Sequence, residues 1–193
     1  MKIVAKAVYD SIQHEIHQIP LNEFLLSPDE AQSLRSKKIE QIVQKNLANQ
    51  TEEIQRRVLA EINTWGPLTE LLQDESITEI IVNGPQAIWL ERAGRLFKHP
   101  DSFFSELSFR NCIDRLSHES NTHITKEFPS ADGSFQDFRL SLIGSDITHS
   151  SVHLTLRRHP KNPWTFLKLA ESGWCQERDL RLFQELVEKK KTF

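Results

Sequence analysis

The chain has 193 residues, of which 38% are apolar and 26% are charged, and it carries a formal net charge of −3. No apolar stretch approaches the roughly 20 residues that span a bilayer, so the composition is typical of a soluble globular protein. The sequence pI near 6.2 gives no overall electrostatic case for binding nucleic acid. Only Cys112 and Cys175 occur and no secretory signal is visible, which favours a reducing, cytoplasmic setting.

Apolar residues at helical spacing predict three amphipathic helices in the first third of the chain, over residues 3–18, 38–47 and 51–63. In "SPDEAQ", Ser27 can cap a helix that starts with Pro28, and Glu30 completes a capping box, so the second helix should begin near residue 28. Short loops between helices favour antiparallel packing. We therefore expect residues 1–63 to form a small helical bundle.

The segment Trp65-Gly66-Pro67 ends the helical pattern, because glycine and proline break helices, and it predicts a domain boundary near residue 64. Beyond it, "PLTELLQD" predicts one or two helical turns, and the β-branched run "ITEIIVN" predicts a strand. "AIWLERAGRLFK" predicts a hairpin around Arg92-Ala93-Gly94, in which Gly94 can supply a positive φ.

The next segments complete a mixed fold. "SELSFRNCIDRLSHES" predicts an amphipathic helix that buries Leu107, Cys112 or Ile113, and Leu116. "FRLSLIG" and "SVHLTLRR" alternate apolar and polar side chains, as half-buried antiparallel strands do. The predicted fold class is therefore α+β: a helical bundle, then an α/β domain over residues 64–163 with a largely antiparallel sheet.

The tail of the chain, residues 164–193, predicts two more helices. In the last helix, Leu180, Phe183 and Val187 should lie on one apolar stripe, with lysines at the negative end of the helix dipole.

A long run of this sequence resembles a known family. "GPLTELLQDESITEIIVNGPQAIWLERAGRL" is similar to the N-terminal region of type II/type IV secretion ATPases, in which Gly-Pro-Leu, Ile-Thr-Glu-Ile, Val-Asn-Gly-Pro and a hairpin follow in this order. "DGSFQDFRLSLIG" and "HLTLRRHPKNPWTFLKLAESGW" resemble later segments of that region, and the bundle resembles the tight-adherence (Flp) pilus branch. The resemblance implies a PAS-like domain at 64–163 and a helical linker at 164–193.

No phosphate loop of the form G-x-x-x-x-G-K-[ST] occurs in the sequence, although the family's loop follows shortly after the helix that ends here in "ELVEKKK". The resemblance therefore implies an N-terminal region without the motor domain, with no catalytic residues of its own. It implies ATP with Mg²⁺ in the complete protein, and none tightly bound to this chain. It also implies a homo-hexamer, contacts with a motor domain of the same or a neighbouring subunit, and an inner-membrane platform protein as partner.

In the resembled family, arginines of this region reach the phosphates of the nucleotide, and the matching candidates are Arg139, Arg157 and Arg158. Arginine suits this role because its planar, permanently charged group forms two parallel hydrogen bonds with phosphate oxygens. Strand alternation sends Arg157 and Arg158 to opposite faces, so we expect only one of them to face nucleotide. We expect Arg139 and that residue to be exposed, on one face, and unpaired with carboxylates.

The sequence also departs from the family pattern. Asp132-Gly133-Ser134 stands where the family has Asp-Gly-Arg, which removes one cation and leaves the register of Arg139 open. Other features carry weaker signals: no metal site is indicated by the pairs His14/His17 and His149/His153, because no third ligand is implied. The basic pair Arg56-Arg57 is expected to be a solvated surface.

Two functions are consistent with these observations. The first is a non-catalytic N-terminal region of a secretion or pilus-assembly ATPase, which serves as ring scaffold, lever and nucleotide clamp. The alternative is a stand-alone regulatory module that binds a partner protein or a small ligand such as a cyclic dinucleotide.

Overall fold

The computed structural model describes residues 1–20, 28–148, 151–160 and 165–190. The chain divides into two compact units, Met1–Arg158 and His159–Phe193, and each is described by itself. None of the helices in the described ranges is long and apolar enough to cross a membrane.

Three helices open the first unit, α1 (Lys2–His17), α2 (Pro28–Leu47) and α3 (Glu52–Asn63). All three were predicted, and α2 begins at Pro28 as expected, although its predicted cap Ser27 lies outside the described residues. α1 contacts both other helices. Their shared core is apolar and includes one residue from far along the chain; its buried members are Ala5, Tyr9, Ile12, Leu47, Val58 and Phe104.

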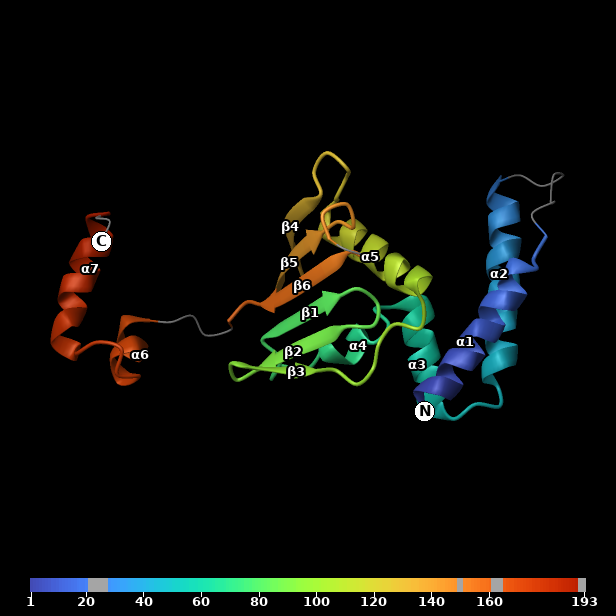
Figure 1. Cartoon of the computed structure of the whole chain (residues 1–193), viewed down its shortest axis with the longest axis horizontal. Helices are drawn as coiled ribbons and strands as arrows, with labels where there is room; N and C mark the ends of the chain where they lie inside the picture. The colour runs from blue at the N-terminus through green and yellow to red at the C-terminus, as the bar shows by residue number, and fades with distance from the viewer. Residues whose placement is uncertain (21–27, 149–150, 161–164, 191–193) are drawn as a thin grey trace. The chain divides into compact units, whose positions relative to one another are not determined.

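A six-stranded sheet with the order β3-β2-β1-β6-β5-β4 follows these helices in the first unit (Figure 1). Its strands are β1 (Glu79–Asn83), β2 (Ile88–Arg92), β3 (Arg95–Lys98), β4 (Ser130–Phe135), β5 (Phe138–Ile143) and β6 (His153–Arg158). Every neighbouring pair is antiparallel, which confirms the predicted α+β class and the predicted type of sheet.

Helices α4 (Leu68–Leu71) and α5 (Glu106–Ser120) pack against one face of this sheet, and their apolar side chains form one core with the inward-facing strand residues. The prediction that α5 buries Leu107 is wrong, since Leu107 is 48% exposed. The buried stripe of α5 has the spacing i, i+3, i+4, i+7, and it consists of Phe109, Cys112, Ile113 and Leu116.

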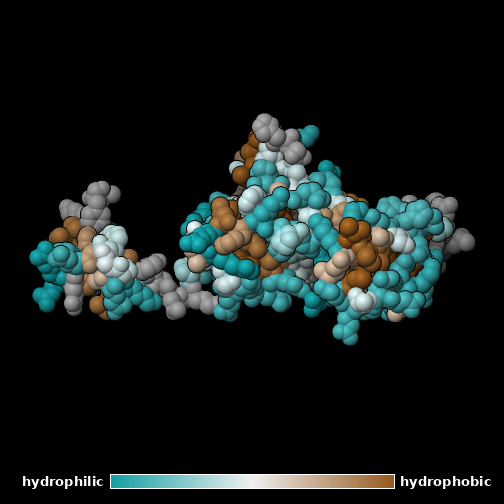
Figure 2. Space-filling model, turned by 60° about the horizontal axis from the view of Figure 1, so that its bottom comes forward, coloured by the Kyte–Doolittle hydropathy of each residue, from teal (hydrophilic) through white to brown (hydrophobic). Residues whose placement is uncertain are grey.

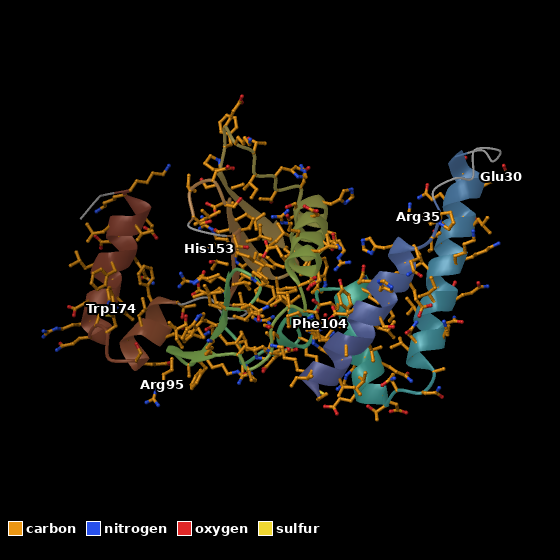
Figure 3. The ribbon with its side chains drawn as sticks, turned by 45° about the vertical axis from the view of Figure 1, so that its right-hand side comes forward. Glu30, Arg35, Arg95, Phe104, His153 and Trp174 are labelled. Atoms are coloured by element: carbon orange, nitrogen blue, oxygen red, sulfur yellow. The ribbon has the colours of Figure 1, made fainter. Side chains whose placement is uncertain are left out.

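A buried charge network joins the helices to the segment that leads into α5. Arg57 donates from Nη1 to Glu61 Oε2 at 2.6 Å and from Nε to Asp101 Oδ2 at 2.6 Å. The side chain of Glu61 is fully buried, and its other oxygen accepts from the backbone N–H of Phe104 at 2.8 Å. The expectation of a solvated Arg57 is therefore wrong: its side chain is only 10% exposed and lies over the ring of Phe104. Figure 3 shows Phe104 where helices and strands meet.

The hairpin β2–β3 turns through two residues with positive φ, Ala93 at 48° and Gly94 at 73°. This is the combination that a two-residue type I′ turn needs, and it matches the twist of the flanking strands. Gly94 thus supplies the predicted positive φ, while Ala93 adopts it despite its Cβ.

The second unit contains α6 (Phe166–Glu171), a 3₁₀ turn (Glu177–Asp179) and α7 (Leu180–Glu188). Both predicted tail helices are present. Leu180 is buried in the unit and Phe183 packs against Trp174 with ring centroids 5.3 Å apart. Leu180, Phe183 and Val187 have the spacing i, i+3, i+7 within α7 and so lie on one side of it, as predicted, although Val187 is 57% exposed.

Candidate functional site

The face of the sheet opposite α4 and α5 carries a row of charged residues, one from each of four adjacent strands. The register aligns Glu91 of β2 with Glu79 of β1, Glu79 with Arg157 of β6, and Arg157 with Arg139 of β5. Side chains directly opposite each other on neighbouring strands lie on the same face. Two carboxylates and two guanidiniums therefore form one continuous line across the sheet.

Arg139 and Arg157 are exposed and directly opposite each other on β5 and β6. Directly opposed residues of an antiparallel pair have Cβ atoms about 4.5–5.5 Å apart, and like charges at such positions destabilise the sheet. This is the arrangement predicted for these two residues. A phosphate group within reach of both guanidiniums would neutralise the repulsion between them.

Arg139 has a carboxylate partner, because its Nη2 lies 3.3 Å from Asp132 Oδ2 on β4. The expectation that Arg139 is unpaired is therefore wrong, although both side chains are 61% exposed and such surface pairs contribute little to stability. The hydroxyl of Ser141 and the guanidinium of Arg139 both hydrogen-bond Asp132, and these contacts lower the pKa of its carboxyl.

Arg157 forms no ion pair or hydrogen bond with any residue that the structure describes. Its nearest carboxylate across the β1–β6 register is Glu79. The pKa of Glu79 is raised, chiefly because burial penalises its charged form, while the charge of Arg157 acts in the opposite direction. A hydrogen bond and the negative charge of Glu91 raise the pKa further.

Arg158 lies on the opposite face, so the prediction that Arg157 and Arg158 diverge is confirmed. The side chain of Arg158 is 10% exposed and forms an ion pair with Asp137. Its guanidinium also lies over the ring of Phe138 and donates to three backbone carbonyl oxygens, those of Ile77, Leu72 and Asp74. These contacts link the segment before β1 to Asp137 in the β4–β5 turn. The structure does not bring Arg158 to Arg139 and Arg157.

In the segment Asp132-Gly133-Ser134, the structure explains the glycine, but nothing in it explains the serine that stands where the family has arginine. A Cβ atom at Gly133 would come within 1.9 Å of Thr122 Oγ1, so the close approach of that side chain requires glycine. Asp132, on the exposed face, pairs with Arg139. The sequence analysis missed Asp132 and Glu79 as neighbours of the arginines; the alternation of "ITEIIVN", which turns Glu79 outward, was the available signal.

Within the described ranges, no group of three or more His, Cys, Asp or Glu side chains is arranged to hold a metal ion. His149 of the pair His149/His153 lies outside those ranges.

Comparison with known proteins finds structural likenesses, with 18 chains of solved structures matching. No protein-family model and no curated protein matches the chain. It is similar to the crystal structure of the VirB11 ATPase of the Brucella suis type IV secretion system in complex with sulphate, with 20% identity and a TM-score of 0.43. The match covers 62% of this chain but spans only 36% of that one. At this identity and TM-score it assigns neither a family nor a function.

Proposed function

We propose that the chain is the non-catalytic N-terminal region of a secretion or pilus-assembly ATPase, and that Arg139 and Arg157 contact the phosphates of a nucleotide held by a motor domain. The observation that carries the proposal is the direct opposition of these two exposed guanidiniums on the open face of the sheet. Like charges directly opposite each other do not stabilise a sheet, and a polyphosphate is a ligand whose negative charge two guanidiniums can bind. The sequence motifs of residues 66–96 and 153–174 support the same assignment.

In this proposal Arg139 and Arg157 orient the β- and γ-phosphates, and Asp132 and Glu79 compete with the phosphates for the two cations. Binding then requires Arg139 to leave its exposed pair with Asp132, which costs little because such pairs contribute about 0–1 kcal/mol. ATP with Mg²⁺ supplies the phosphoryl chemistry when the motor domain is present. Closure of this region on the nucleotide, and its release after hydrolysis, would make it a lever.

The remaining parts of the proposal concern assembly. Six copies would form a ring in the cytoplasm, with residues 1–63 as an arm toward an inner-membrane platform protein, residues 64–163 as the nucleotide-facing domain, and residues 164–193 as the link to the motor domain. No role for nucleic acid is proposed.

The test is an NMR titration of the chain with MgATP, observing the guanidinium signals of all arginines. We expect the signals of Arg139 and Arg157 to move together at millimolar ligand, and Arg139→Ala or Arg157→Ala to abolish the shift at the remaining partner. Arg110→Ala, which removes an exposed arginine from α5, is the matched control. A cyclic dinucleotide that shifts these signals while MgATP does not would replace the proposal with the regulatory alternative.

A further inference from the structure

We propose that the free edge of β3 binds an extended segment of another protein by strand addition, and that this segment carries the pattern acidic, apolar, apolar, acidic. β3 is the last strand of the sheet on its side, and all four of its residues are exposed (Figure 1). An exposed edge strand presents a row of backbone hydrogen-bonding groups that a further strand can use.

The register of the hairpin identifies those groups. Arg92 and Arg95 close the two-residue turn, so they form a hydrogen-bonded pair, and hydrogen-bonded pairs then recur at every second position. The bond from His99 N to Ile88 O, at 2.9 Å, confirms this phase. The N–H and C=O groups of Leu96 and Lys98 therefore point away from β2, about 6.8 Å apart along the strand. No backbone bond to these outward groups is formed by any described residue.

The side chains of β3 offer an apolar contact on each face of the sheet. Leu96 is 59% exposed on the arginine face and Phe97 is 49% exposed on the helix face. Figure 2 shows apolar side chains gathered over the strands, apart from a second patch over the N-terminal helices. An added strand with two successive apolar residues would cover Leu96 with one of them and Phe97 with the other, because successive side chains point to opposite faces.

Cations flank this apolar pair, with Arg95 at one end of β3 and Lys98 at the other. Figure 3 shows Arg95 extending outward from the hairpin. Neither side chain forms an ion pair with a described residue. Opposite charges at directly paired positions stabilise neighbouring strands. A partner with an acidic residue opposite each cation therefore complements "RLFK" along its whole length.

The same charges argue against a second copy of the chain as the occupant. Pairing of β3 with β3 of another copy would gather two arginines and two lysines along one short seam, and charged residues on edge strands oppose such self-pairing. An acidic partner strand would instead be attracted by the positive charges of Arg95 and Lys98. The surface is independent of the proposed nucleotide function, since Arg139 and Arg157 lie on other strands.

The experiment uses a short peptide with two central valines flanked by glutamates, added to the isotope-labelled chain. We expect hydrogen exchange to slow at the amides of Leu96 and Lys98 and to stay unchanged at Phe97, whose N–H already bonds β2. A peptide N-methylated at alternate residues, which removes the outward backbone contacts, should lose binding. Absence of binding at about 1 mM peptide, or equal binding of the methylated peptide, would overturn the proposal.

Charge reversal tests the choice of partner. Arg95→Glu with Lys98→Glu should weaken the acidic peptide at least about fivefold and create binding of the corresponding lysine peptide. Arg110→Glu with Lys126→Glu makes the same change in net charge away from β3 and should leave affinity unchanged. If the slowed exchange at Leu96 and Lys98 instead appears without peptide and grows with chain concentration, the occupant is a second copy and the proposal is wrong.

Discussion

Arg57 and Glu61 form an ion pair at 2.6 Å one turn apart on α3, and both are withdrawn from solvent, with side chains 10% and 0% exposed. The pair is the centre of a network that reaches Asp101, the backbone of Phe104 and the hydroxyl of Ser108. Breaking a buried pair leaves an uncompensated charge, which is costly.

Replacing Glu61 with glutamine should therefore lower the free energy of unfolding by about 3 kcal/mol or more, since the neutral amide cannot balance Arg57 and cannot accept all three bonds in the same geometry. Urea denaturation followed by circular dichroism measures the change. Glu53→Gln, at an exposed position on the same helix, is the matched control and should change stability by less than about 0.5 kcal/mol. Equal effects of the two substitutions would show that the network does not stabilise the fold.

The adjacent residues Arg157 and Arg158 on β6 should differ in how much they contribute to stability. Arg158→Ala removes an ion pair and three carbonyl contacts and should cost about 2–4 kcal/mol of unfolding free energy. Arg157→Ala removes an exposed side chain that lies opposite a like charge, Arg139, on one side and an opposite charge, Glu79, on the other, and should change stability by less than about 0.5 kcal/mol. Thermal unfolding of the two variants side by side decides the matter, and a larger loss for Arg157→Ala would contradict the assignment of roles.

The two cysteines should differ in reactivity. Cys112 is fully buried, and burial raises the pKa of its thiol to about 12, so the reactive thiolate is essentially absent at neutral pH. Cys175 is partly exposed. A maleimide reagent should modify one thiol in the native chain and two in denaturant, as counted by mass spectrometry. Cys175→Ser should leave no rapidly reacting thiol; fast modification of that variant would show that α5 opens readily.

A substitution at Ala93 in the hairpin turn should increase the stability of the chain. An alanine held at φ 48° is strained relative to glycine, and Ala93→Gly should stabilise the chain by about 0.5–1 kcal/mol. Gly94→Ala, the reverse change at the next residue of the same turn, should destabilise it by a similar amount. Melting temperatures of the two variants should move in opposite directions, and a fall for both would exclude a type I′ turn in solution.

The raised pKa of Glu79 predicts that the stability of the chain depends on pH. Its pKa is raised in the folded state, so its contribution to stability is fully present below the ordinary carboxyl value and is lost as the pH rises through the raised value. Glutamine cannot ionise, so Glu79→Gln prevents this loss of stability. The variant should therefore gain stability relative to the unmodified chain between about pH 4 and pH 7. Denaturation midpoints across that range measure the difference, and a constant offset would mean that Glu79 titrates normally.

The sequence predicted the helices and strands whose apolar residues repeat with a clear helical or strand period. The apolar stripes of α1 and α3 and the alternation in β5 and β6 lie where expected because burial imposes these periods. β4 was missed: "SADGSF" has low strand propensity and forms an edge strand through its pairing with β5. Leu107 was misassigned because the prediction set the wrong phase: it lies two residues, about 200°, before Phe109 and so on the side of α5 away from the buried stripe.

The candidate site was predictable in part. Leu154 and Leu156 alternate toward the core, which also places Arg158 on the buried face and Arg157 on the open one. The register that sets Arg139 against Arg157 depends on how the strands pair, and no local pattern encodes it. The ion pair of Arg57 with Asp101 could not be predicted from the sequence either, since Asp101 lies 44 positions away in the chain.

Phe104 has a consequence for the order of events during synthesis. Its ring fills the core of α1, α2 and α3, although it follows the last residue of α3, Asn63, by about 40 positions. At about 5–20 residues per second, the ribosome needs roughly 2–8 seconds to cover that distance. The core of the three helices stays incomplete through this interval, and Phe104 can complete it only after β1, β2 and β3, which precede it in the chain, have been made.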